Sequence, residues 1–317
     1  MRSFSRWSWR ALTLVALACS PARTPQRTGA AAASAPPAAS APVVAAPTND
    51  AASANPDGEP CGPLACLSFD SPEKAFARVL AEQPLILAIG EAHAQKGTEG
   101  IASVTRRFTE QLLPMLQGKA SDLVLELWIA SGQCGKREKQ VAQQQKEVTV
   151  TQAETNQNEF VALGKTSKAF GIEPRVLRPT CADYERIAAA GAGDIATMLE
   201  MIARLSGDEL ESLFLERKTA TTGRMLLAYG GALHNDIAPR PERQTWSFGP
   251  RMSDLTASRY VELDLVVPEF IGDGPAWKAL PWVLHYDRTR HGRRVILFHP
   301  APRSYVLIFA AREASVH

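Results

Sequence analysis

The sequence predicts an α/β domain with a mainly parallel, mixed central sheet, helices on both faces and a C-terminal β-hairpin. Short apolar runs alternate with segments of helical periodicity along most of the chain, and two apolar runs close together near the end suggest a hairpin. The apolar runs are continuous, which is typical of strands buried on both faces. Strands that alternate with helices favour a parallel sheet.

The first 19 residues have the pattern of an export signal. Three arginines, Arg2, Arg6 and Arg10, precede the apolar run "ALTLVALA", which is too short to span a bilayer. The small residues before Cys19 fit ordinary signal cleavage and also lipoprotein processing, in which Cys19 carries the lipid. We favour lipidation, which predicts a membrane-anchored lipoprotein of a bacterial envelope, on its periplasmic or surface side. The alternative is a secreted protein.

Residues 20–60 are rich in Ala, Pro and Ser, and they predict a disordered tether because they cannot bury enough apolar surface to fold. Residues 61–317 then form a single α/β domain. The formal net charge is +2, and no basic stripe interleaved with aromatic residues appears, which excludes nucleic-acid binding. Contact with a membrane is expected through the N-terminal lipid alone.

The first elements of the domain follow from local signals. A helix begins with Ser71 as N-cap and Pro72 at the first helical position. An apolar strand follows at 85–89, apolar residues at helical spacing predict one helix over 98–117, and a second strand covers 122–128. This β-α-β unit predicts a parallel pair of strands.

The later elements continue the alternation. The segment 136–158 is rich in Gln, Lys and Glu, and it is either a solvated helix or a mobile excursion. The remaining predictions are a helix ending at Gly171, a strand at 174–180, helices over 182–190 and 195–218, strands at 224–231 and 259–267, and a hairpin of 293–298 with 305–309.

Four cysteines remain when Cys19 is set aside, and an even number in an exported chain favours disulfides. Four cysteines allow three pairings. The short segment "CGPLAC" allows a Cys61–Cys66 bond, which leaves Cys134 to pair with Cys181. Metal binding by these cysteines is the weaker interpretation, because no close Cys-x-x-Cys pair is present.

Polar side chains follow or interrupt several of the predicted strands. Glu91 and His93 come directly after the first apolar strand, and His234 follows a later strand with the same Gly-x-x-His spacing. Glu126 lies inside an apolar strand, where a carboxylate needs a partner. It is either one of the residues of a pocket or the structural partner of a buried Arg. Ligands of open α/β sheets bind beyond the carboxyl ends of the strands. The sequence therefore predicts a Glu/His pocket at that edge of the sheet.

Other polar residues have structural interpretations. Glu262 and Asp264 lie on one face of a later strand and can face solvent at a sheet edge, so we do not assign them to the pocket. A lone histidine near a strand end is usually a hydrogen-bonded structural residue. This interpretation applies to His285, His291, His299 and His317.

Three segments together resemble the erythromycin esterase / ChaN-like / TIKI superfamily: "LAIGEAH", then "LVLELW", then "GALH". The resemblance implies an α/β fold in which Glu91, His93, Glu126 and His234 are the pocket residues. Members of this superfamily include esterases that open macrolide lactones, metal-dependent membrane-tethered proteases and surface lipoproteins that bind haem. The Gln-rich segment after Cys134 departs from the family pattern and leaves the substrate open.

Two functions from different classes are expected from these residues. In the first, the protein hydrolyses an ester or peptide bond in a small molecule or peptide. His93, oriented by a carboxylate, is the general base, and His234 with the glycine-loop amides stabilises the oxyanion. In a variant, His93, His234 and Glu91 hold a divalent metal that activates the water. In the second function the pocket binds haem without catalysis, with His93, His234 or Tyr229 as axial ligand.

Overall fold

The computed structural model describes residues 57–191, 193–218 and 223–311. The predicted signal peptide, the Cys19 lipidation site and residues 20–56 of the predicted tether lie outside the described residues. Two residues of that tether prediction are corrected: Glu59 and Pro60 belong to the first strand of the sheet. They pair with the next strand across the short loop that holds Cys61 and Cys66.

A nine-stranded mixed sheet organises the described residues, in the order β1-β2-β8-β9-β7-β3-β6-β4-β5. The strands are β1 (Glu59–Gly62), β2 (Cys66–Phe69), β3 (Ile86–Glu91), β4 (Ala120–Trp128), β5 (Glu173–Leu177), β6 (Met225–Gly231), β7 (Tyr260–Val266), β8 (Val295–Ala301) and β9 (Ser304–Ile308). All pairs from β9 to β5 are parallel, whereas β1, β2, β8 and β9 pair antiparallel. The predicted fold class and the C-terminal hairpin are thus confirmed.

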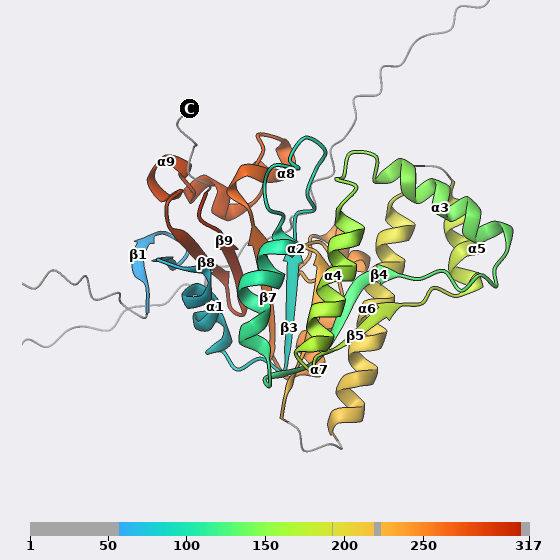
Figure 1. The fold of residues 1–317 in the computed structure, drawn as a ribbon, viewed down its shortest axis with the longest axis horizontal. Helices are drawn as coiled ribbons and strands as arrows, with labels where there is room; N and C mark the ends of the chain where they lie inside the picture. Colours follow the sequence, from blue (N-terminus) through green and yellow to red (C-terminus); the bar gives the residue numbers. More distant parts are fainter. Residues whose placement is uncertain (1–56, 192, 219–222, 312–317) are drawn as a thin grey trace, which may run out of the picture.

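Helices cover both faces of the sheet (Figure 1). The helices on one face are α1 (Pro72–Leu80), α2 (Val104–Arg107) and α4 (Asn156–Ala169), and those on the other are α6 (Ala196–Lys218) and α7 (Gly249–Leu255). Alternate residues of β3 serve the two faces: Leu87 and Ile89 pack with the first group, and Ile86 and Ala88 with the second. This explains why the strand reads as a continuous apolar run.

The start of α1 confirms the predicted capping. Ser71 is extended, and its hydroxyl accepts a hydrogen bond from the Lys74 amide at 3.4 Å, while Pro72 occupies the first helical position. Of the helices in the described residues, none combines the length and the apolar character that a membrane span requires.

The helix predicted over 98–117 is wrong in its start and in its regularity. Helix α2 begins only after Ser103, whose hydroxyl accepts from the Arg106 amide at 3.0 Å. The chain then widens into a π-helix, η1 (Phe108–Leu112), and tightens into a 3₁₀ turn, η2 (Leu113–Leu116). Pro114 is the physical reason, because proline has no amide hydrogen and its ring clashes with the carbonyl four residues earlier in a regular α-helix.

The pairing predicted for the first two strands is also corrected. β3 and β4 are parallel, but β6 lies between them and pairs with both. The register of β3 with β6 sets Gly90 opposite Gly230 and Glu91 opposite Gly231. The two Gly-containing strand ends are therefore direct neighbours.

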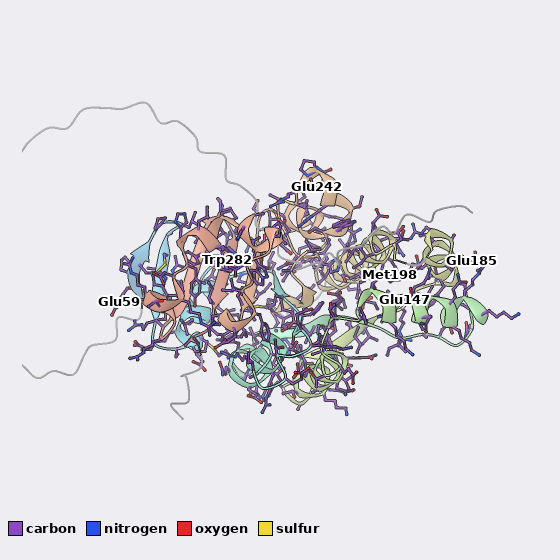
Figure 2. The ribbon with its side chains drawn as sticks, turned by 90° about the horizontal axis from the view of Figure 1, so that it is seen from above. Glu59, Glu147, Glu185, Met198, Glu242 and Trp282 are labelled. Carbon is purple, nitrogen blue, oxygen red and sulfur yellow. A yellow bond between two sulfur atoms is a disulfide. The ribbon has the colours of Figure 1, made fainter. Side chains whose placement is uncertain are left out.

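The Gln-rich segment forms helix α3 (Lys136–Val148), which fits the solvated alternative because only Val141 and Gln144 are buried. α3 packs against α5 (Cys181–Ala190), and the Cys134–Cys181 disulfide joins the starts of the two helices, with the Cα atoms 5.2 Å apart. This unit lies at the end of the molecule opposite β1 (Figure 2). The second predicted disulfide, Cys61–Cys66, is also present, with a Cα separation of 5.1 Å.

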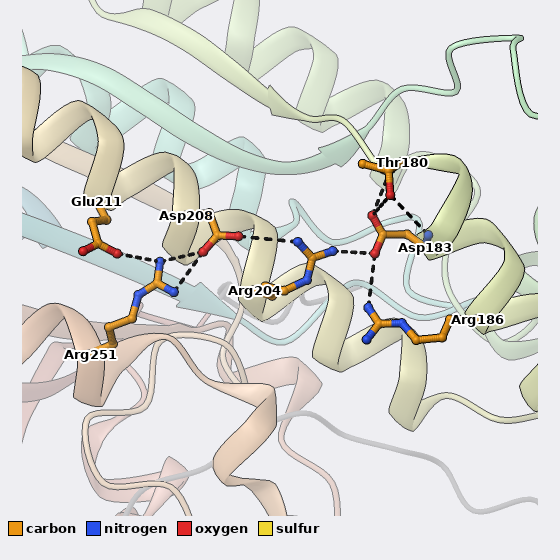
Figure 3. Close-up of polar contacts among 7 residues, drawn as sticks. All are labelled: Thr180, Asp183, Arg186, Arg204, Asp208, Glu211 and Arg251. Atoms are coloured by element: carbon orange, nitrogen blue, oxygen red, sulfur yellow. Dashed lines mark hydrogen bonds and ion pairs between the residues drawn. The ribbon is translucent and has the colours of Figure 1, made fainter.

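A chain of ion pairs connects α5, α6 and α7 (Figure 3). Arg204 on α6 binds the buried carboxylate of Asp183 on α5, with 2.5 Å between Nη2 and Oδ1. Asp208, one turn further along α6, pairs with Arg204 and with Arg251 of α7. The network fixes the position of α6 against both neighbours, and α6 forms one wall of the site described next.

The remaining elements are short. They are η3 (Pro241–Trp246), η4 (Pro268–Phe270), α8 (Pro275–Lys278), η5 (Pro281–His285) and α9 (Arg288–His291).

Candidate functional site

The carboxyl ends of β3, β4 and β6 bring the four predicted pocket residues together. A Cβ placed on Gly231 would lie 3.4 Å from His93 Nε2, 3.4 Å from Glu126 Oε2 and 3.9 Å from His234 Cδ2. Glu91 is bonded directly to His93. The structure therefore brings these four residues together at one edge of the sheet.

Glu91 is buried and holds His93 in place. His93 Nδ1 lies 2.8 Å from Glu91 Oε1, and because a carboxylate only accepts, Nδ1 carries the hydrogen. The second carboxylate oxygen accepts from the hydroxyls of Thr105, at 2.7 Å, and Tyr229, at 2.6 Å. Both oxygens of Glu91 are thus occupied, and the free Nε2 atom of His93 is directed to the space beside Gly231.

Glu126 and His234 form a second acid–histidine pair. Glu126 Oε2 accepts from the Gly231 amide at 2.5 Å, and Oε1 lies 3.5 Å from His234 Nε2. On the other side of the ring, His234 Nδ1 donates to the carbonyl oxygen of Trp246 at 2.8 Å. That bond fixes the orientation of the ring and turns Nε2 toward Glu126.

The electrostatics of the site set the resting protonation states. Burial lowers the pKa of His93, but the hydrogen bond and negative charge of Glu91, helped by Glu126, outweigh it and raise the pKa from 6.5 to about 9. Burial acts to raise the pKa of Glu126, yet the charge and hydrogen bond of His234, the charge of His93 and the Gly231 amide lower it to about 2. At neutral pH His93 is therefore an imidazolium and Glu126 a carboxylate.

Tyr229, one of the residues predicted as an axial ligand in the haem alternative, lies beneath the surface and contacts Glu91. Its side chain is 1 % exposed, and its hydroxyl donates to Glu91. Burial and the neighbouring Glu91 raise the pKa of the Tyr229 phenol well above 10, so the hydroxyl stays protonated. Tyr229 therefore supports the Glu91–His93 pair through its hydrogen bond to Glu91.

Three amides of the glycine loop after β6 already donate hydrogen bonds within the fold. The Gly231 amide donates to Glu126, the Ala232 amide to the Glu91 carbonyl at 3.1 Å, and the His234 amide to the Gly231 carbonyl at 3.0 Å. The protonated Nε2 of His93 is the donor that faces the site instead.

A small cavity of about 10 Å³ lies beside the second pair, lined by Glu126, Gly231 and His234 together with Ile202 and Ser206 of α6. A space of this size holds about one water molecule. Among the residues that the structure describes, no group of three or more His, Cys, Asp or Glu side chains is arranged to hold a metal ion.

Glu262 and Asp264 do not face solvent, which corrects their interpretation. They are 2 % and 0 % exposed on β7, at the centre of the sheet. Asn235 Nδ2 donates to Asp264 Oδ1 at 3.2 Å, and burial, then Asp264 and Asp236, raise the pKa of Glu262 well above its usual range.

Thr105 was missed by sequence reasoning, and nothing local marks it. It lies in the first turn of α2, and only the fold brings its hydroxyl to Glu91. Of the histidines interpreted as structural, His291 is buried and its Nδ1 accepts from the Asp287 amide at 3.2 Å, whereas His285 is exposed. His317 lies outside the described residues.

No protein-family model, curated protein or solved structure matches the chain. The resemblance to the erythromycin esterase / ChaN-like / TIKI superfamily stays a prediction that rests on the three sequence segments.

Proposed function

We propose that the protein is an exported hydrolase that adds water to an ester or peptide bond at the point beside Gly231. One observation carries the proposal: His93 Nε2 and Glu126 Oε2 lie at the same 3.4 Å from that point, and the two groups carry opposite charges at neutral pH. An acid and an acceptor on either side of one small space are what general acid–base hydrolysis requires.

The attacking water is held by the second pair. Glu126 Oε1 accepts a hydrogen from the water, and the His234 ring lies beside it, with Nε2 3.5 Å from that oxygen. The bond from His234 Nδ1 to the Trp246 carbonyl holds the ring in this position. As the water attacks, the Glu126 carboxylate takes its proton, which returns to His93 through solvent after the leaving group has departed.

His93 acts on the other side of the scissile bond. Its protonated Nε2 donates to the carbonyl oxygen as negative charge develops there, and it then gives its proton to the leaving group. Glu91 keeps the ring oriented through Nδ1, 2.8 Å away. Overall one water is consumed: its hydroxyl joins the acyl carbon, and the leaving group departs with a proton. His93 is therefore proposed as acid, in place of the general base that the sequence suggested.

The location of the proposed activity is outside the cytoplasm. Two disulfides support an oxidising compartment. The N-terminal pattern supports export, and a lipid on Cys19 would hold the domain at a membrane.

The test is turnover of ester and peptide panels by the mature chain, with and without added Mn, Co or Zn. We expect His93→Ala and Glu126→Gln to lower kcat by about 10²–10⁴-fold, the usual contribution of a positioned acid or base. His285→Ala is the matched control, because His285 is exposed and outside the site. Absence of turnover by the wild type under all conditions would sink the proposal. A haemin absorption shift that disappears in His93→Ala would then favour ligand binding.

A further inference from the structure

A second cavity, of about 200 Å³, lies next to the proposed site. Its walls are the loop after β3, the first turn of α2 and the start of α4, and they include Ala94, Ser103 and Glu159. This volume is below that of pockets that enclose a whole drug-sized ligand. It suits one side group of a larger substrate.

One wall of the cavity is directly connected to the proposed site. Ala94 follows His93 in the chain, and its carbonyl oxygen accepts from the Ala153 amide at 2.8 Å and from Asn156 Nδ2 at 3.1 Å. Phe160, the neighbour of Glu159, has its ring centroid 6.0 Å from that of His93. A substrate group in this cavity would therefore lie beside the reacting bond.

Glu159 supplies an incompletely used carboxylate to this space. Ser103 Oγ donates to Glu159 Oε2 at 2.5 Å. Within the described part of the chain that is the only hydrogen bond to the Glu159 side chain, so Oε1 remains available to a ligand. Glu159 is only partly exposed, which makes a free carboxylate oxygen there more costly than at the surface.

The charges around the cavity leave it negative. Arg106 is the cation in its lining, and its Nε atom is paired with Glu110 Oε1 at 2.8 Å. Glu99 adds a further carboxylate to the wall. Burial raises the pKa of Glu159 and the Ser103 hydrogen bond lowers it; the charge of Glu91 raises this pKa further, and the opposite effects of Arg106 and Glu110 are smaller. The start of α4 favours an anion, but Glu159 in the first turn of that helix already provides it.

We infer that this cavity is a subsite for a cationic group, an alkylammonium carried by the substrate, with the Glu159 carboxylate as its counter-ion. The part played by this subsite in substrate choice rests on the proposed hydrolytic function. Cation binding itself does not, because it needs neither His93 nor the attacking water.

The first test measures the equilibrium binding of n-butylammonium and of uncharged n-butanol at pH 7, with ligand-observed NMR as the readout. We expect n-butylammonium to bind at least about 10-fold more tightly than n-butanol, since 1.4 kcal/mol of charge interaction gives that factor. Glu159→Gln should abolish the difference. Glu154→Gln is the matched control, because Glu154 is exposed and not in the lining, and His93→Ala should bind as the wild type does. Equal binding of n-butylammonium by wild type and Glu159→Gln overturns the inference.

The second test compares hydrolysis of the p-nitrophenyl esters of 4-aminobutyrate and pentanoate, which differ in one charged group. We expect kcat/KM to favour the aminobutyrate ester in the wild type, and Glu159→Gln to remove that preference while leaving the pentanoate ester unaffected. Ammonium binding without hydrolysis of either ester means that the hydrolase proposal fails and the subsite stands. Hydrolysis of both esters at equal rates, with no ammonium binding, means that the subsite inference fails and the hydrolase proposal stands. Unchanged thermal unfolding of Glu159→Gln shows that the effects of this variant on binding do not come from a loss of the Ser103 contact.

Discussion

The Nδ1 atom of His93 lies 2.8 Å from Oε1 of Glu91, a carboxylate that is 2 % exposed. Tyr229 and Thr105 donate to the opposite oxygen, so both oxygens of this buried carboxylate have hydrogen-bond partners. The consequence is an imidazolium at the edge of a sheet, with its second nitrogen directed at Glu126. The predictions below follow from this arrangement and from the elements that hold it.

The pH dependence of activity distinguishes an acid from a base at His93. As an acid, His93 must be protonated, so kcat/KM should fall as the pH rises through about 9. In Glu91→Gln the pKa of His93 should move down toward 6.5, and the fall in activity should move with it. The measurement is a pH–rate profile together with an NMR titration of the His93 ring. A rate that instead rises through pH 9 would assign the general-base role to His93.

The stability of the protein should also decline on the alkaline side. A histidine whose pKa is raised from 6.5 to about 9 stabilises the fold fully below pH 6.5, and this contribution disappears as the pH rises through 9. A rise of this size corresponds to a free energy of unfolding on the order of 3 kcal/mol. Denaturant unfolding at pH 6 and pH 10 measures it. Glu91→Gln should show a smaller difference between the two pH values, and an equal difference would contradict the pairing.

Two neighbouring glycines should respond differently to alanine. A methyl group on Gly231 would lie 3.4 Å from His93 Nε2 and from Glu126 Oε2, in ordinary contact, and Gly231 does not require a positive φ. Gly231→Ala should change stability by less than about 1 kcal/mol. It should still lower activity about 100-fold, because the methyl occupies the reacting position. Thermal unfolding and steady-state kinetics on the same sample test both parts.

Gly230→Ala is the counterpart. Its added methyl group would lie 2.7 Å from Glu126 Cβ, which is closer than two carbon atoms can approach. The strand must shift, and we expect a loss of about 1–3 kcal/mol in unfolding free energy. Equal stability of the two variants would show that the contact at Gly230 is relieved without cost.

The two disulfides should contribute unequally to stability. The Cys134–Cys181 bond closes a sequence separation of 47 residues, for which chain entropy predicts about 4 kcal/mol, whereas the separation of 5 in Cys61–Cys66 predicts about 2 kcal/mol. Paired Cys→Ala variants, compared by denaturant unfolding, give the order. Alkylation and intact mass before and after reduction confirm which bonds are present, and a larger effect for Cys61–Cys66 would contradict the expectation.

The contacts that depend on short sequence distance were accessible from the sequence. Glu91 and His93 are two residues apart at a strand end, so their contact and their place at the sheet edge follow from local geometry. Ser71 and Pro72 likewise marked the start of α1 correctly. Pro114 is a visible signal against a regular helix, and its effect on the backbone outweighs the helical periodicity around it.

Non-local relationships were not accessible in the same way. The insertion of β6 between β3 and β4 is a pairing of strands far apart in the sequence, and no local pattern encodes it. The Thr105 bond to Glu91 joins residues 14 positions apart through the turn of α2. The burial of Asp264 follows from the central place of β7 in the sheet, and its same-face spacing with Glu262 fits a solvent edge equally well.

The register that sets Glu91 opposite Gly231 makes the site part of the sheet itself. A slip of one residue between β3 and β6 would send every side chain of the slipped strand to the opposite face, and His93 with it. The arrangement of the site residues therefore depends on this strand pairing. Transplanting the site into another scaffold requires two adjacent parallel strands in this alignment and a third parallel strand in the place of β4. Grafting a loop alone would not reproduce it.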